Sequence, residues 1–244
     1  MPSRLNSSLL KSPLEDVLQR HPVWRGGALT GAAPALPTGF PALDAELPGG
    51  GWPSGALTEI LCNHQAIGQL GLLLPALAAL TRAGKRVVWL APPHLPYAPA
   101  LAAAGIDLTQ LAVIRAPGRR DGLWAAEQVL RAASCHALLA WLPRARYPEL
   151  RRLAVAAEAG RALVALWRPT EALHESTPAC LRLALEPAAG GLAVRLLKRR
   201  GAPLAVPLLV QVKRPVHALG CPASARPRAG DARADRRLGL PVHA

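Results

Sequence analysis

The chain has 244 residues, of which 51% are hydrophobic but only 4% aromatic, so alanine, leucine and valine must fill its core. This length suits one large domain or a domain with appendages, and the apolar share can bury a substantial core. The formal net charge is +14, and residues 195–244 carry eleven Lys or Arg against two Asp. This basic end of the chain fits a polyanion or an acidic partner, and equally a solvated tail.

The cysteine pattern and the hydropathy exclude several classes of protein. The four cysteines are scattered without a C-x-x-C pair, which predicts neither a disulfide framework nor a zinc site. The longest apolar run, residues 70–80, is about half the length that spans a bilayer. No stretch at the start reads as a signal peptide. The sequence therefore predicts a cytoplasmic protein without a metal or a membrane segment.

The two ends of the chain differ from its centre. Ser12, Pro13 and Glu15 form a typical helix start, which predicts a short N-terminal helix within residues 1–24. A Gly/Ala/Pro-rich linker is expected over 25–36, and Trp24 beside it is a candidate partner contact because a tethered Trp can fill a pocket. Residues 215–244 lack periodicity, which predicts a flexible basic tail.

Residues 37–214 alternate short apolar strands with longer helices. The expected strands are 57–61, 86–91, 111–115, 137–142, 162–167, 180–186, 192–198 and 208–213. The expected helices are 67–83, 98–104, 123–134 and 147–160. The first strands show little period-two alternation, as expected of buried parallel strands. The pattern predicts a doubly wound α/β core with a mostly parallel sheet, flanking helices and an antiparallel edge.

Several segments together resemble the RecA core. They are LPTGFPALDAELPGGGWPSGALTEI (36–60), GKRVVWLAPPH (84–94), HALLAWLP (136–143) and LLKRRGAP (196–203). The resemblance covers residues 37–213 and implies a RecA-like fold. Within the first segment, Thr38, Gly39, Leu43 and Asp44 are interpreted as structural, forming a turn, a helix cap and a core anchor. Glu59 is given no functional role.

The resemblance fails where an ATPase carries its chemistry. A phosphate loop needs G-x-x-x-x-G-K-[ST], in which Lys balances phosphate charge and the hydroxyl holds Mg²⁺. Here Asn63 replaces the first glycine, Gly68 is kept, and the last two positions are Gln69 and Leu70. The acid that would hold the metal falls on Trp141, or on Ala140 with a shifted register. The acid that would orient water falls on Pro92 or Pro93. We therefore expect a degenerate nucleotide loop, no cofactor and no enzyme activity.

Among degenerate RecA-like proteins, the sequence resembles the ImuA family, which is associated with translesion DNA synthesis. The shared features are the capped N-terminal helix, W-R-G at 24–26, the 36–60 segment and a loop running into LLLPALAAL. The resemblance implies a non-catalytic adaptor in SOS-induced mutagenesis and DNA repair. Its partners would be an ImuB-like inactive Y-family polymerase, an error-prone C-family polymerase and RecA. The alternatives are a SulA-like cell-division inhibitor and a single-stranded DNA-binding accessory protein with residual nucleotide binding.

The basic triplet Lys198, Arg199 and Arg200 is a further candidate contact site. In an active RecA-like filament these positions would face the phosphates of an adjacent subunit, so the resemblance implies contact with a partner or weakly with DNA. Because runs of charged residues are usually exposed to solvent, a solvated β-turn is the favoured interpretation. The six tryptophans are expected mostly in the core.

Overall fold

The computed structural model describes residues 35–63, 68–201, 204 and 206–212. The predicted N-terminal helix, Trp24 and the basic tail lie outside the described residues. So does most of the predicted linker, although its last two residues form a short strand, β1 (Ala35–Leu36), that pairs with β2 (Trp52–Pro53). The domain limits at the two ends of the chain therefore stay predictions.

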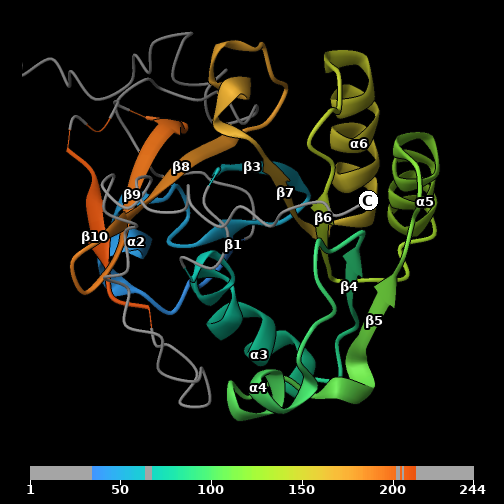
Figure 1. Ribbon diagram of the computed structural model, residues 1–244, viewed down its shortest axis with the longest axis horizontal. Coiled ribbons are helices and arrows are strands. Elements are labelled where there is room, and N and C mark those ends of the chain that lie inside the picture. The colour runs from blue at the N-terminus through green and yellow to red at the C-terminus, as the bar shows by residue number, and fades with distance from the viewer. Residues whose placement is uncertain (1–34, 64–67, 202–203, 205, 213–244) are drawn as a thin grey trace, which may run out of the picture.

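An eight-stranded sheet forms the centre of the molecule (Figure 1), in the order β10-β9-β8-β3-β7-β6-β4-β5. Its strands are β3 (Ala56–Leu61), β4 (Val87–Leu90), β5 (Leu111–Ile114), β6 (Ala137–Trp141), β7 (Leu163–Arg168), β8 (Leu181–Ala188), β9 (Gly191–Lys198) and β10 (Leu208–Val210). The strands from β8 to β5 run parallel, and β9 runs antiparallel to both of its neighbours. One edge of the sheet is thus antiparallel, as the sequence predicted.

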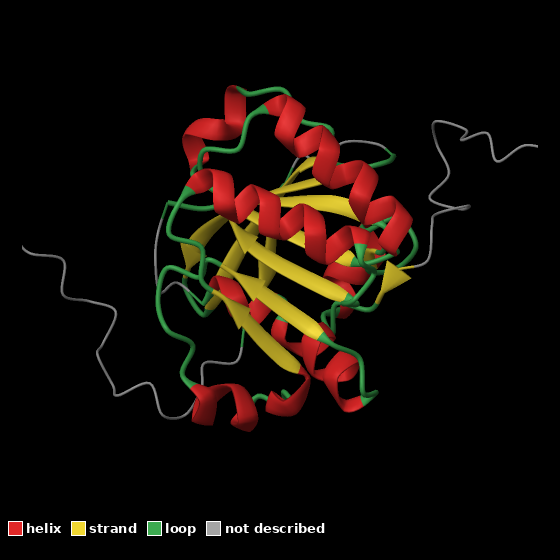
Figure 2. Ribbon diagram, turned by 90° about the vertical axis from the view of Figure 1, so that its right-hand side faces the viewer, coloured by secondary structure: helices red, strands yellow, loops and turns green. Residues whose placement is uncertain are grey.

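Helices cover both faces of this sheet (Figure 1 and Figure 2). The α-helices are α2 (Pro41–Glu46), α3 (Leu74–Arg82), α4 (Ala98–Ala103), α5 (Arg119–Arg131) and α6 (Tyr147–Gly160). Short 3₁₀ turns are η1 (Gln69–Leu72), η2 (Leu108–Gln110) and η3 (Thr170–His174). Among the described residues, no helix is long and apolar enough to cross a membrane.

Alternate residues of each central strand belong to two separate hydrophobic clusters. In β4, Val87 and Trp89 join the cluster under α3 and α4, whereas Val88 and Leu90 join the cluster under α5 and α6. A strand buried on both faces needs apolar residues at every position, because successive side chains point to opposite faces. The expected α/β core with a mostly parallel sheet between helices is therefore confirmed in this general form. The finer RecA-like assignment stays a prediction.

The segment that precedes β2 is held by local hydrogen bonds. The Thr38 backbone N–H donates to Asp44 Oδ1 at 2.8 Å, and the Phe40 N–H donates to Thr38 Oγ1 at 3.0 Å. Leu43 on α2 is fully buried. Gly39 has a φ of +86°, and a Cβ there would lie 2.5 Å from the Pro75 Cβ, so only glycine fits. The expected turn and core anchor are therefore present, whereas no side chain caps the N-terminus of α2.

Each strand and helix expected between residues 37 and 214 has a counterpart, but some boundaries differ. The expected helix 67–83 divides into η1 and α3, because a 3₁₀ turn follows the positive φ of Gly68 and Pro75 begins the α-helix proper. Helix α5 begins at Arg119, four residues before the predicted start at Leu123. The first turn of α5 is polar, so hydrophobic periodicity could not detect it.

Candidate functional site

The degenerate loop after β3 is tied to the neighbouring η3 turn. Asn63 Nδ2 donates to Glu171 Oε1 at 3.0 Å, and Asn63 Oδ1 accepts from the Thr170 backbone N–H at 2.7 Å. A glycine in place of Asn63 could make neither contact. Residues 64–67, the centre of this loop, are outside the described part of the chain. At this position a phosphate loop has a glycine and exposes backbone amides to the nucleotide. Here the Asn63 side chain instead binds the neighbouring η3 turn.

The later loop positions face the core. Gly68 takes a left-handed conformation with a φ of +89° and caps η1, which begins at Gln69. Leu70 is half-buried against the cluster under α3 and α4. Leucine can neither hold Mg²⁺ nor donate to a phosphate, and here its side chain contributes to packing.

A tryptophan cluster occupies the ends of the central strands. Trp141, at the end of β6, stacks on Trp167 of β7 with ring centroids 4.6 Å apart and planes 8° from parallel. Trp89 of β4 meets Trp141 edge-on at 5.9 Å. Both geometries are preferred for aromatic pairs. The position where a metal-binding acid was sought therefore belongs to an aromatic layer, and no group of three metal-ligating side chains occurs in the residues that the structure describes.

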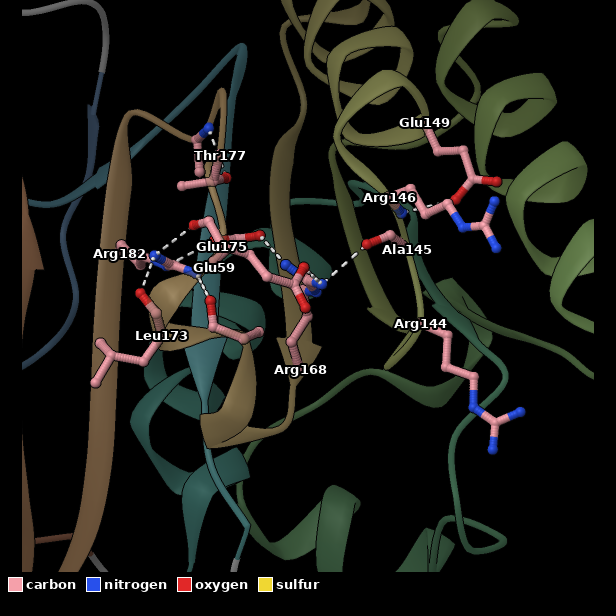
Figure 3. Close-up of polar contacts among 12 residues, drawn as sticks. Glu59, Arg144, Ala145, Arg146, Glu149, Arg168, Leu173, Glu175, Thr177 and Arg182 are labelled. Carbon is pink, nitrogen blue, oxygen red and sulfur yellow. Dashed lines mark hydrogen bonds and ion pairs between the residues drawn. The ribbon is translucent and has the colours of Figure 1, made fainter.

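A buried ionic network lies at the ends of β3, β7 and β8 (Figure 3). Glu59 on β3 is fully buried and lies 3.2 Å from Arg168 Nη1 and 2.9 Å from Arg182 Nε. Arg168 Nη2 also reaches Glu175 Oε2 at 2.6 Å and donates to the Ala145 carbonyl at 2.9 Å. A buried carboxylate is tolerated only when it is paired, and here two guanidinium groups pair with it.

The same network fixes the segment 170–177, which contains η3. Arg182 donates to the carbonyls of Ala172, Leu173 and Glu175, the last two at 3.1 and 3.2 Å. A cation at the carbonyl end of a helical turn is a favourable arrangement. Sequence reasoning missed Arg168 and Arg182 and assigned Glu59 no role. The available signal was a charged residue within or at the end of each of three mainly apolar strands.

The three residues of the basic triplet have different environments. Lys198 Nζ donates to the Thr177 carbonyl at 3.1 Å. The Arg199 side chain is 9% exposed, and its Nη1 pairs with Glu46 Oε2 at 2.7 Å. Arg200 is exposed. Arg199 therefore ties β9 to α2, and the basic surface of this turn comes from Lys198 and Arg200.

Exposed apolar side chains gather where β4 and β5 end. Leu95 is 74% exposed and Tyr97 is 63% exposed in the loop that leads to α4, and Val113 on the edge strand β5 is 39% exposed. Leu95 and Val113 line one shallow groove together with Pro93 and Arg115. We call Leu95, Tyr97 and Val113 the β4–β5 patch. Pro93, where a water-orienting acid was sought, is thus part of a surface groove.

Trp124 departs from the expectation that the tryptophans lie mostly in the core. Its side chain is 64% exposed on α5, whereas Trp52, Trp89 and Trp167 are buried. An exposed Trp is a large apolar surface that a partner can cover.

Two thiols and one carboxyl have shifted pKa values. Burial raises the pKa of Cys135 to about 11. Burial also raises the pKa of Cys180, while Arg200 and Lys198 act in the opposite direction. Hydrogen bonds from the side chain and the backbone N–H of Thr109 lower the pKa of Asp107. Both thiols are therefore protonated at neutral pH and are poor nucleophiles.

The fold defines an α/β protein in which the loop after β3 lacks the Lys and the hydroxyl that a phosphate loop needs. A family model described as "Cell division inhibitor SulA" matches residues 55–164. The cell division inhibitor SulA of Edwardsiella piscicida is 32% identical over 100 residues, which are 41% of this chain and 60% of that protein. The chain thus spans less than two thirds of the curated relative that it matches. The crystal structure of SulA from Pseudomonas aeruginosa is 23% identical, with a TM-score of 0.40, and the match covers 46% of this chain and 97% of that one.

These comparisons correct the interpretation drawn from sequence motifs. The resemblance to ImuA is wrong, because the matches fall on SulA. The predicted role as a translesion adaptor is wrong with it, as are the expected partners: the ImuB-like protein, the C-family polymerase, RecA and DNA. The motifs that carried the resemblance are turns, strand ends and a buried leucine helix. Such features follow from the fold, so they could not distinguish one degenerate family from another.

Proposed function

We propose that this chain is a SulA-like inhibitor of cell division that acts by binding a protein of the division machinery, with FtsZ as its target. The support is the match of residues 55–164 to the SulA family model and the similarity to a curated SulA over 100 residues. Inhibition by binding needs a surface and no reaction, so the protein acts without a cofactor. It works in the cytoplasm as part of the response to DNA damage.

The observation that carries the proposal is the β4–β5 patch, which lies inside the matched segment. Its three side chains are apolar and 39–74% exposed. Large apolar side chains that gather on a surface mark interaction sites, whereas scattered ones need no explanation. Leu95 and Val113 share one groove, so a partner could bury both with a single inserted side chain.

The groove also indicates the chemistry of the partner surface. Prolines at 92, 93, 96 and 117 line it, and they restrict the backbone before a partner arrives. A preformed site loses less entropy on binding. Arg115 at the rim is exposed and favours an acidic residue opposite. We infer that the target presents an apolar side chain beside a carboxylate.

Expression of the full chain in a rod-shaped bacterium tests the function. Wild-type protein should produce filamentous cells that replicate DNA but do not divide. The double variant Leu95→Asp/Tyr97→Asp should restore division, because two charges in the patch oppose its burial. Val206→Asp is the matched control, since Val206 is 70% exposed but outside the matched segment. Normal division with the wild-type chain at verified expression would overturn the proposal.

A sedimentation assay with purified FtsZ separates the target from the phenotype. Wild-type protein should reduce the amount of pelleted FtsZ polymer, and the patch variant should lose at least tenfold in potency while keeping its urea midpoint. If the cells become filamentous but FtsZ sedimentation is unaffected, the chain still inhibits division, but FtsZ is not its target.

The remaining candidate residues take structural or secondary roles in this proposal. The core is a RecA-like unit over residues 37–214 whose loop at Asn63 and Gly68 serves packing. Lys198 and Arg200 form a second, basic contact with the division protein. Trp24 stays a candidate anchor outside the described residues. Charge reversal of Lys198 and Arg200 should weaken inhibition less than the patch variant does.

A further inference from the structure

Helices α5 and α6 lie side by side on one face of the sheet (Figure 1 and Figure 2). A shallow groove on their surface is lined by one residue of α5, Arg131, and by seven of α6: Pro148, Glu149, Arg151, Arg152, Val155, Ala156 and Ala159. We call it the α5–α6 groove. It is separate from the β4–β5 patch, with which it shares no lining residue.

The floor of the α5–α6 groove is apolar and narrow. Val155 is 61% exposed, which is unusual for a β-branched apolar side chain in the middle of a helix. Ala159 beside it is small and exposed and lets another backbone approach closely, whereas Ala156 is buried beneath them. Trp124 lies three residues before Glu127 and seven before Arg131, so it shares their side of α5. A strip of apolar surface therefore runs along the groove with an exposed Trp next to it.

The rim of the α5–α6 groove is positively charged. Its lining residues include three arginines, at positions 131, 151 and 152, against one acidic residue, Glu149. Two acidic residues at the groove already pair with arginines. Glu127 pairs with Arg131 at 2.6 Å and approaches Arg152 at 3.8 Å. Glu149 pairs with Arg119 at 2.8 Å. The arginine side chains at positions 131 and 152 are nevertheless 63% and 61% exposed, so their charge is available to a ligand.

We propose that the α5–α6 groove binds an acidic amphipathic helix of a partner protein. The apolar strip accepts the leucine-like face of such a helix, and the arginines pair with carboxylates on its flanks. A nucleic acid fits less well, because the floor offers aliphatic carbons, and Glu127 and Glu149 would meet the phosphates. The protein thus has a second binding surface, which allows it to hold two proteins at once.

The direct test uses two fluorescein-labelled peptides of about 18 residues that share one leucine stripe and differ in their polar face. One carries glutamates and the other carries lysines. Fluorescence anisotropy with the purified full chain should show saturable binding of the glutamate peptide, weakened several-fold by raising the salt from 50 to about 300 mM. The lysine peptide should not bind. Equal binding of both peptides, or none of either, would overturn the proposal.

Variants locate the binding to the α5–α6 groove. Arg151→Glu/Arg152→Glu should weaken binding of the glutamate peptide at least tenfold, and Val155→Ser should weaken it several-fold. Glu127→Gln should tighten it, because it removes the carboxylate that competes for two arginines. Arg86→Glu, an exposed charge reversal outside the groove, is the control. Unchanged binding of the glutamate peptide by the Arg151/Arg152 variant would exclude the groove as its site. If the chain bound a single-stranded DNA of about 18 nucleotides more tightly than the glutamate peptide, the ligand would be a nucleic acid and the proposal would be overturned.

The test is independent of the function proposed above. The Arg151→Glu/Arg152→Glu variant should still inhibit FtsZ sedimentation, because the β4–β5 patch is unchanged. A variant that loses both activities with an unchanged urea midpoint would show one shared surface and refute a second site.

Discussion

Replacement of Glu59 by leucine should destabilise the fold strongly, although Glu59 has no predicted role in binding. Its carboxylate is fully buried, and the side chains of its partners Arg168 and Arg182 are 1% and 7% exposed. Leucine at this position leaves the buried Arg182 guanidinium without its carboxylate and removes one of the two carboxylates that pair with Arg168. Breaking a buried pair in this way costs about 3–5 kcal/mol. Arg182 keeps its three carbonyl acceptors and Arg168 keeps Glu175, so we expect a loss near the lower value.

Urea denaturation of the full chain measures this loss as a lower midpoint at an unchanged slope. Arg119→Leu is the control, because its pair with Glu149 is 40% and 18% exposed and should contribute no more than about 1 kcal/mol. The double variant Glu59→Leu/Arg182→Met should regain part of the loss, since it removes one buried charge together with its partner. If Glu59→Leu costs no more than Arg119→Leu, the carboxylate is not the centre of a buried network.

Three further predictions concern packing and ionisation. Gly191→Ala should lower the unfolding free energy by about 1–3 kcal/mol, because a Cβ would lie 2.2 Å from the Val210 carbonyl oxygen. Gly84→Ala and Gly190→Ala meet no atom within 4 Å and add only the strain of a positive φ, so each should cost about 1 kcal/mol in the same urea assay. Trp141→Ala should abolish much of the near-ultraviolet circular dichroism, because it removes the ring shared by both aromatic contacts; an unchanged spectrum would contradict the cluster. Cys135 should resist iodoacetamide at pH 8 and react on unfolding, as peptide mapping would show, because burial raises its pKa from 9.0 to about 11. Its linked contribution to stability is fully present below pH 9.0 and is lost as pH rises towards 11; a stability that is flat across this range would contradict the shift.

The strand pattern of the core could be predicted well because buried parallel strands are short apolar runs between turns. The run VVWL at 87–90 and the run ALLAW at 137–141 both became strands with every described residue at least half-buried. The first residues of helices were harder to predict from the sequence. The first turn of α5 contains Arg119, Arg120 and Asp121, so a search for apolar periodicity finds the helix only from Leu123.

The polar contacts could not be predicted because they join distant parts of the chain. Glu59 and Arg168 are 109 positions apart, and only the alignment of β3 with β7 brings them together. Exposed apolar residues could not be predicted either. A tryptophan in an amphipathic helix predicts a buried side chain, but Trp124 is exposed. The family assignment failed for a related reason: the glycine turns and strand ends that resembled ImuA are requirements of the backbone.

The tryptophan layer at Trp89, Trp141 and Trp167 has a consequence for how this fold could be engineered. Active sites in α/β proteins usually leave the ends of the strands open and pay for it in stability. Here that end of the sheet is closed by stacked rings. The layer therefore makes this chain a scaffold on which exposed residues elsewhere can be exchanged without opening the strand ends.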